Sequence, residues 1–489
     1  MSVTQWTALE LARAILARKL SVPEALRELW DVAGRTEEKV HAYLATDPEQ
    51  AMREAERIQS RIDRGAITSP LAGVPIAIKD NICTDHLKTT CGSRMLENFL
   101  PPYRATVIDK LYENGLIING KLNMDEFAMG STTETSYFGV TANPWDPNRV
   151  PGGSSGGAAA AVAVGSAVCA LGSDTGGSIR QPASHCGVTG FKPTYGTVSR
   201  YGLIAYASSL EQIGPIARDA ADCAALMDVI RGRDERDSTL TVSGEESYLS
   251  ALDSNVSGLR IGIPCESLAG DIAPDVVGCV LEAAKQFEKM GAVVEECRFP
   301  MMKHAVATYY IIATAEAASN LARYDGIKYG YRAAGDVPLS EVYTQSRSEG
   351  FGDEVKRRIM LGNFVLSAGY YDAYYRRALD AKAAITAYFE TLWERYDLLL
   401  MPTAPTTAPR MGVSLADALG MYSADRYTVP ANLAGLPALT LPCGFGEDRM
   451  PIGVQLIGPA FSDARVLSVG YAYQQVTDHH TKRPGEVLA

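Results

Sequence analysis

The sequence predicts an α/β protein built on one large mixed β-sheet that helices cover on both faces. Short apolar runs typical of buried strands alternate with longer segments of helical periodicity. The 489 residues are 46% apolar and 21% charged, an ordinary globular mixture that can form a sizeable core. No internal repeat or low-complexity linker interrupts the alternation. We therefore expect a single domain over residues 1–489.

Three parts of this domain differ in sequence pattern and in motif content. Residues 1–66 form an N-terminal helical segment, and residues 21–24 (Ser-Val-Pro-Glu) make a capping box at the start of one of its helices. Residues 71–240 hold the densest motifs, and residues 241–489 supply the remainder of the sheet and further helices. The charged stretch 231–237 is expected to be a surface loop.

The elements expected after residue 66 follow from apolar runs, glycine stops and helical spacing. The strands are expected at 74–78, 116–118, 167–171, 259–263, 293–294, 398–401, 439–442 and 454–457. The helices are expected at 105–114, 158–164, 219–230, 276–290, 303–323, 353–394 and 464–475.

Composition restricts the classes of function. The formal net charge is −11, so the overall field repels nucleic acid. Nine cysteines occur without a CxxC pair, which favours free buried thiols in a reducing compartment. The N-terminal residues lack the continuous apolar run of a signal peptide, and the run at 158–164 is far shorter than the ~20 residues that span a membrane. A cytoplasmic protein is expected.

Glycine is enriched, with 44 residues or about 9%, against roughly 7% in average proteins. One cluster, residues 151–157 (Pro-Gly-Gly-Ser-Ser-Gly-Gly), directly precedes an alanine-rich helix. Backbone N–H groups at such a helix start can cradle a phosphate, but the sequence has no P-loop pattern and no lysine closing this loop. A purely structural turn is the other interpretation of this cluster.

The second cluster is residues 172–180 (Gly-Ser-Asp-Thr-Gly-Gly-Ser-Ile-Arg), which follows an expected strand. A serine after two glycines, here Ser178, suits a nucleophile whose neighbouring N–H groups stabilise an oxyanion. The hydroxyl needs a base. Among only six histidines, His185 is close in sequence but has no evident orienting partner, and the pair at 479–480 is expected to be solvated. No HExxH or clustered Cys/His pattern predicts a metal site.

Lys79 is the other candidate base, because it ends an apolar strand where a charge is costly. It could reach solvent or pair with Asp80. Alternatively, a buried and neutral lysine could take a proton from a serine. A helix N-terminus after Gly157 would lower its pKa further, since the positive end of the dipole disfavours a second positive charge.

Taken together, Lys79 and residues 151–157 and 172–182 resemble the signature of the amidase signature family. The resemblance extends over nearly the whole chain, with supporting segments at 121–134, 191–202, 358–362 and 427–437. His185 stands where the family pattern favours an aromatic residue, outside the chemistry.

The resemblance implies a Ser–cis-Ser–Lys triad on this family's fold. Ser178 would be the nucleophile, Ser154 the relay after a cis peptide bond, and Lys79 the base. The N–H groups of Thr175, Gly176, Gly177 and Ser178 would hold the oxyanion.

Within the family, the closest resemblance is to glutamine-hydrolysing subunits of tRNA-dependent amidotransferases. It implies that Arg358 binds the carboxylate of glutamine, that Asp425 pairs with its ammonium group, and that Tyr309 hydrogen-bonds nearby. Residues 129–131 (Met129, Gly130 and Ser131) would also line this pocket. The residues alone do not separate Arg358 from Arg357, and only the family pattern does.

The resemblance also implies partners. A tRNA-binding subunit would use ATP and Mg²⁺ to activate the misacylated residue and would receive ammonia, and a small third subunit would complete a heterotrimer. This chain would hold no metal or cofactor. Whether Glu-tRNA, Asp-tRNA or both accept the amide stays open. Two other hypotheses remain: a stand-alone amidase for another small amide, and a non-enzymatic phosphate-binding or scaffold protein that uses the glycine loops.

Overall fold

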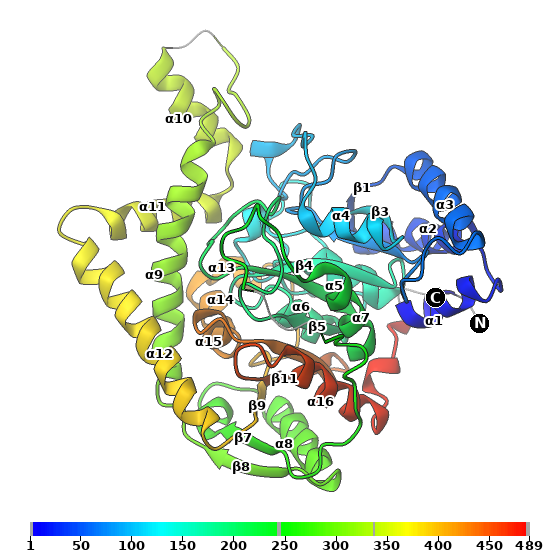
Figure 1. The fold of residues 1–489 in the computed structure, drawn as a ribbon. Helices are drawn as coiled ribbons and strands as arrows, with labels where there is room; N and C mark the ends of the chain where they lie inside the picture. The colour runs from blue at the N-terminus through cyan, green and yellow to red at the C-terminus, as the bar shows by residue number, and fades with distance from the viewer. Residues whose placement is uncertain (1–2, 242–245, 336–337, 486–489) are drawn as a thin grey trace.

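A computed structural model describes residues 3–241, 246–335 and 338–485 (Figure 1). One mixed sheet of eleven strands runs through them in the order β1-β3-β2-β4-β6-β5-β10-β11-β9-β7-β8. Pairing is parallel between β2 and β3, β2 and β4, β7 and β8, and β7 and β9, and antiparallel elsewhere. The strands are β1 Tyr43–Ala45, β2 Pro75–Lys79, β3 Ile117–Leu122, β4 Cys169–Asp174, β5 Thr189–Lys192, β6 Gln212–Ala217, β7 Arg260–Pro264, β8 Val293–Cys297, β9 Leu398–Pro402, β10 Ala438–Phe445 and β11 Pro451–Ile457.

Helices surround this sheet, and a group of long ones stands at one side of the molecule, where α9, α11 and α12 lie together (Figure 1). The helices are α1 Ala8–Leu16, α2 Val22–Val40, α3 Pro48–Asp63, α4 Thr106–Glu113, α5 Gly156–Val164, α6 Arg180–Cys186, α7 Ala220–Ile230, α8 Pro274–Lys289, α9 Met302–Asn320, α10 Leu339–Gly350, α11 Asp353–Leu366, α12 Arg377–Trp393, α13 Val413–Ala416, α14 Ala418–Ala424, α15 Val429–Leu433 and α16 Asp463–Gln475. No helix of the described ranges is long and apolar enough to cross a membrane.

The central strands of the sheet are buried on both faces, as the sequence predicted. Side chains alternate along β9, where Leu398 and Leu400 join one apolar cluster and Leu399 and Met401 join another. Successive side chains of a strand point to opposite faces, so each face has its own core. The expected α/β class with a mixed sheet and helices on both faces is confirmed.

Several elements differ from the expectation. The N-terminal segment holds the short strand β1 between its helices. The pattern at 353–394 is two helices rather than one, because the chain turns at Gly369, whose φ of +89° suits glycine. Strands β5 and β6 were not predicted. Strand β6 contains Gly214 and Pro215, two residue types that strands normally avoid, and this hid it from the pattern.

The sheet also explains where a site can form. Strands β2 and β4 pair in parallel, with Ala77 opposite Ala170 and Ile78 opposite Leu171. Their carboxyl ends, Lys79 and Asp174, therefore reach the same edge of the sheet. Helix α5 begins close to this edge at Gly156, inside the first glycine cluster, and α6 begins there at Arg180, the last residue of the second.

Helices α9 and α11 pack at unusually close range, and Gly362 permits this. A Cβ atom at Gly362 would overlap the backbone carbonyl of Thr314 on α9. We predict that Gly362→Ala forces the two helices apart and lowers the free energy of unfolding by ~1–3 kcal/mol. The control is Gly278→Ala on α8, where a Cβ meets nothing within 4 Å. That change should raise stability by roughly 0.5–1 kcal/mol, because alanine favours a helix.

Thermal melting and urea unfolding of the two alanine variants measure this difference. Equal stability of Gly362→Ala and the wild-type protein would contradict the close packing of α9 against α11.

Candidate active site

Lys79 points into the protein and contacts the first glycine cluster. Its side chain is fully buried, and Nζ donates hydrogen bonds to Ser154 Oγ at 2.7 Å and to the carbonyl of Ser173 at 3.3 Å. Asp80, the alternative partner, instead forms an ion pair with Lys121 at 3.1 Å. The structure therefore rules out a lysine that reaches solvent or pairs with its neighbour.

Burial lowers the pKa of Lys79 to about 7, and the carboxylates of Asp125 and Asp174 oppose this shift. Loss of hydration is thus the leading cause, as expected for a buried lysine. At neutral pH a large share of the lysine is unprotonated and can accept a proton from the hydroxyl that it contacts.

The first glycine cluster is a packed turn, with residues 151–157 all buried. The peptide bond between Gly153 and Ser154 is cis, as the family resemblance implied. A Cβ atom at Gly157 would meet the carbonyl oxygen of Asn123 at 2.5 Å, so only glycine fits there. The N–H groups of Gly156 and Gly157 at the start of α5 already donate to Thr133 Oγ1 and to the carbonyl of Asn123, so they are not free to cradle a phosphate.

Ser154, rather than Ser155, is the serine that faces Lys79. Ser155 Oγ donates to the carbonyl of Ser173 at 3.2 Å, and its N–H donates to the carbonyl of Ser178 at 3.0 Å. The second of these bonds ties the two glycine clusters together, so that the loops carrying Ser154 and Ser178 lie side by side.

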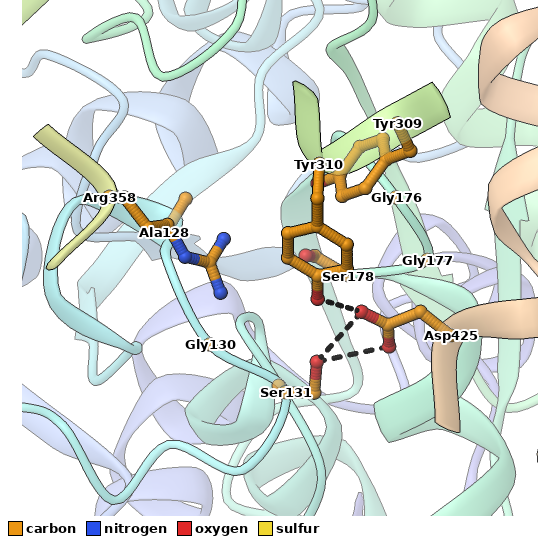
Figure 2. A pocket seen from close by; sticks show the side chains of 11 residues that line it. Ala128, Gly130, Ser131, Gly176, Gly177, Ser178, Tyr309, Tyr310, Arg358 and Asp425 are labelled. Carbon is orange, nitrogen blue, oxygen red and sulfur yellow. Dashed lines mark hydrogen bonds between the residues drawn. The ribbon is translucent and has the colours of Figure 1, made fainter. Parts of the chain in front are cut away.

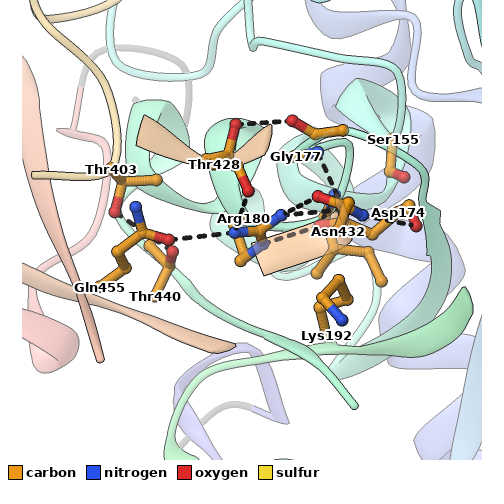
Figure 3. Close-up of polar contacts among 12 residues, drawn as sticks. Ser155, Asp174, Gly177, Arg180, Lys192, Thr403, Thr428, Asn432, Thr440 and Gln455 are labelled. Carbon is orange, nitrogen blue, oxygen red and sulfur yellow. Dashed lines mark hydrogen bonds and ion pairs between the residues drawn. The ribbon is translucent and has the colours of Figure 1, made fainter. Parts of the chain in front are cut away.

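The second cluster is shaped by a fully buried ion pair (Figure 3). Asp174 accepts hydrogen bonds from the N–H groups of Gly177 at 2.8 Å and Ile179 at 3.2 Å, and it pairs with Arg180 at 3.0 Å. Burial alone would raise the pKa of Asp174, but the Arg180 guanidinium holds it well below its usual range. The carboxylate thus stays ionised and bends the chain between Asp174 and Ile179.

Arg180 extends this network to the other half of the chain. Its guanidinium donates to the carbonyl of Thr428 at 3.0 Å, to Gln455 Oε1 at 3.0 Å and to Asn432 Oδ1 at 2.6 Å. Thr428 Oγ1 donates back to the carbonyl of Gly176 at 2.6 Å. The segment before α15 is therefore locked against the loop that carries Ser178.

The expected oxyanion donors need one correction. The N–H of Gly177 is already taken by Asp174, so it does not point at a substrate oxygen in this structure. Within the described residues, no acceptor is found for the N–H groups of Thr175, Gly176 and Ser178. These three amides are the ones left to stabilise an oxyanion.

A small pocket lies over Ser178 (Figure 2). Of residues 129–131, Gly130 and Ser131 line it, whereas Met129 is buried behind the wall and Ala128 takes its place. Tyr309 also lines it, and at Gly176 a Cβ would meet the Tyr309 ring at 2.6 Å, so the ring closes directly over the loop. The lining comprises Ala128, Gly130, Ser131, Gly153, Gly176, Gly177, Ser178, Tyr309, Tyr310, Arg358 and Asp425.

Arg358, and not Arg357, reaches this pocket. The side chain of Arg358 is 2% exposed and that of Arg357 is 47% exposed. Arg358 Nε donates to Glu354 at 2.8 Å and Nη1 donates to the hydroxyl of Tyr206 at 2.8 Å. These bonds fix the plane of a buried guanidinium at the pocket wall, where it can receive a carboxylate.

Asp425 lies in the same pocket as Arg358 (Figure 2). It accepts hydrogen bonds from Ser131 Oγ at 3.0 Å and from the Tyr310 hydroxyl at 2.8 Å. Burial raises its pKa to about 6, so the carboxylate is mostly ionised at neutral pH. Tyr310 escaped the sequence prediction, since a tyrosine in an apolar helix is ordinarily a core residue.

Histidine and metal chemistry find no support at this site. His185 is buried on α6, and burial lowers its pKa to about 4. His479 and His480 are half-buried rather than solvated, and burial lowers the pKa of His480 to about 4. The described residues contain no group of three or more His, Cys, Asp or Glu side chains arranged for a metal ion. All nine cysteines are free thiols, seven of them buried.

Comparison with known proteins gives consistent results. A family model described as Amidase matches residues 24–467. One subunit of the glutamyl-tRNA(Gln) amidotransferase of Lachnoclostridium phytofermentans is 54% identical over 97% of this chain and 98% of that protein. The crystal structure of the corresponding glutamyl-tRNA(Gln) amidotransferase subunit from Thermotoga maritima aligns with a TM-score of 0.81 and 42% identity, over 98% of this chain and 96% of that one. A peptide amidase from Stenotrophomonas maltophilia aligns at 0.80 with 27% identity, over 96% of both chains.

Proposed function

The chain belongs to the amidase signature family, and we propose that it is the glutamine-hydrolysing subunit of a tRNA-dependent amidotransferase. The observation that carries the proposal is the joint presence of Arg358 and Asp425 in the pocket over Ser178. A buried cation and a buried anion at one pocket match the carboxylate and the ammonium of a free amino acid. The names of relatives about 50% identical over nearly the whole chain support the same function.

In this proposal glutamine binds with its α-carboxylate on Arg358 and its α-ammonium on Asp425. Ser131 and Tyr310 hold the Asp425 carboxylate in place through their hydrogen bonds. The side chain of glutamine then extends toward Ser178, and its amide carbonyl lies near the free N–H groups of the second glycine cluster.

The reaction proceeds through an acyl-enzyme. Ser178 Oγ attacks the amide carbon while its proton passes to Ser154, whose own proton passes to neutral Lys79. The oxyanion accepts hydrogen bonds from backbone N–H groups, for which Thr175, Gly176 and Ser178 are available. Collapse breaks the C–N bond, and the proton returns from Lys79 through Ser154 to the leaving ammonia. Water then attacks the ester and gives its proton through Ser154 to Lys79, and as the C–O bond breaks this proton returns to Ser178 Oγ while glutamate is released.

Ammonia is then passed to a partner in the proposed complex. A tRNA-binding subunit uses ATP and Mg²⁺ to activate the glutamate, or aspartate, carried by tRNA, and a small third subunit completes a heterotrimer in the cytoplasm. This chain itself needs no cofactor for the steps above. Its net charge of −11 suits a subunit that leaves tRNA contacts to its partner.

A stand-alone amidase for another small amide is the competing function, because the fold is shared with a peptide amidase. The same triad would act there. A neutral amide substrate offers neither a carboxylate nor an ammonium group. In that case the buried charges of Arg358 and Asp425 would have no group to bind. We therefore favour glutamine.

Reconstitution tests the proposed function. The chain is purified alone and with the two partner subunits of a related amidotransferase, and two quantities are measured: ammonia released from glutamine, and amide transferred to Glu-tRNA. We expect hydrolysis and transfer in the complex, and labelling of Ser178 by an electrophilic glutamine analogue. Efficient hydrolysis of unrelated amides without response to partners would instead establish the stand-alone amidase.

The pH dependence of glutamine hydrolysis should report Lys79 and Asp425. The pKa values of about 7 and about 6 mean that the base is neutral and the ammonium-binding carboxylate is ionised only as pH rises through this range. We expect kcat/KM to increase between pH 5.5 and 7.5 and then level off. Lys79→Ala should abolish turnover with an unchanged circular dichroism spectrum. A flat profile, or turnover without Lys79, would be incompatible with this base.

Arg358 and Arg357 form a matched pair of variants on one helix. Arg358→Gln removes the carboxylate-binding charge, so we expect KM for glutamine to rise at least tenfold, equivalent to ~1.4 kcal/mol of binding. Arg357→Gln removes a half-exposed charge that also contacts Glu354, so it controls for disturbance of that residue. It should change KM less than twofold. Similar KM values for both variants would remove Arg358 from the pocket's function.

A further inference from the structure

A buried carboxylate, Asp125, lies behind the relay serine and has no role in the chemistry described so far. It follows β3 and is fully buried. Its N–H donates to the carbonyl of Ser154 at 3.3 Å. A Cβ atom at Gly153 would overlap the Asp125 carboxylate, so this group packs directly on the Gly153–Ser154 peptide. Asp125 and Lys79 therefore contact the same serine residue, one at its backbone and the other at its hydroxyl.

The hydrogen-bond partners of Asp125 are all neutral. Its carboxylate accepts from the N–H of Thr132 at 3.1 Å and from Thr135 Oγ1 at 2.9 Å, and Thr133 contributes a further backbone donor. Burial raises the pKa of Asp125, and these donors oppose the rise. None of the ion pairs found in the described ranges involves Asp125. When the carboxylate is ionised, its negative charge is therefore not cancelled by a neighbouring cation.

Two other carboxylates close to Lys79 in space or in sequence are compensated. Asp174 pairs with Arg180 at 3.0 Å, and Asp80, the next residue in the chain, pairs with Lys121.

Two further groups face Lys79 from other elements. Glu211, directly before β6, lies 3.5 Å from Arg200. The thiol of Cys91 stays neutral, because burial raises its pKa well above the ordinary value. Asp125 is therefore the uncompensated negative group among those that act on the lysine.

We propose that Asp125 is the counterion of Lys79, a positioning residue that holds the Gly153–Ser154 turn and stabilises the ammonium formed when Lys79 takes the serine proton. A lysine buried at this depth is a poor base, because its charged form loses hydration. The Asp125 carboxylate, when it is ionised, restores part of the basicity of Lys79. The proton that leaves Ser178 through Ser154 then rests on Lys79 opposite Asp125, and it returns to the leaving group from there.

The test replaces Asp125 by its neutral isostere and follows pH dependence. Since the inference rests on the proposed mechanism, two substrates are used: glutamine, and p-nitrophenyl acetate, which can acylate Ser178 without needing Arg358 or Asp425. Without the negative charge, protonated Lys79 is disfavoured and the base stays neutral to lower pH. We expect Asp125→Asn to move the acid limb of the acylation rate down by about 1 pH unit and to lower the plateau about tenfold.

Glu211→Gln is the matched control, since Glu211 also faces Lys79 but is paired with Arg200. The acid limb of its acylation rate should lie at the same pH as that of the wild-type protein. A plateau that falls in Asp125→Asn with an unmoved limb means a purely structural role and overturns the proposal. Hydrolysis of the ester without any hydrolysis of glutamine counts against the proposed function alone. No acylation of wild-type Ser178 overturns both.

A double-mutant cycle keeps the test decisive if Asp125→Asn is poorly folded. Lys79→Met, Asp125→Asn and the double variant are compared by melting temperature at pH 6, where Lys79 is mostly charged, and at pH 8.5, where it is mostly neutral. We expect Asp125→Asn to destabilise the wild-type protein more than the Lys79→Met protein at pH 6, and this coupling to shrink at pH 8.5. Additive effects at both pH values would refute the pairing.

Discussion

The ion pair between Asp174 and Arg180 is the interaction on which the site depends. Both side chains are fully buried, so removal of either partner would leave a bare charge in the core, at a cost of ~3–5 kcal/mol. Asp174 holds two backbone N–H groups and so gives the second glycine cluster its bend, while Arg180 reaches Thr428. One pair thus joins the nucleophile's loop to the segment that presents Asp425, although about 250 residues separate them in sequence.

Glycine in the two clusters of the site works through close packing. Within the two clusters it allows backbone to contact backbone, as at Gly157, and side chain to close over backbone, as at Gly176 beneath Tyr309. The glycines of these clusters are therefore a packing requirement of the site. They leave N–H groups with no side chain in front of them, which is what an oxyanion needs.

The sequence alone predicted the fold class, most strands and the meeting of Lys79 with the first glycine cluster, because those features are local or carried by motifs. It could not predict β6, since its glycine and proline mimic a loop, or the break near Gly369, where helical periodicity continues on both sides. Arg357 and Arg358 are equal in the sequence and differ only in which way the helix faces. Tyr310 and the engaged N–H of Gly177 depend on contacts between distant segments, and no local pattern encodes these.

A lysine base explains the electrostatic design of the site. Histidine titrates near neutral pH without help, whereas lysine must lose several kcal/mol of hydration to do so, and complete burial of Lys79 provides that loss. The same burial destabilises its protonated form. The acids near Lys79 therefore differ in whether a cation pairs with them. Asp174 is paired with Arg180 and Asp80 with Lys121, whereas Asp125 is left to balance one transient positive charge.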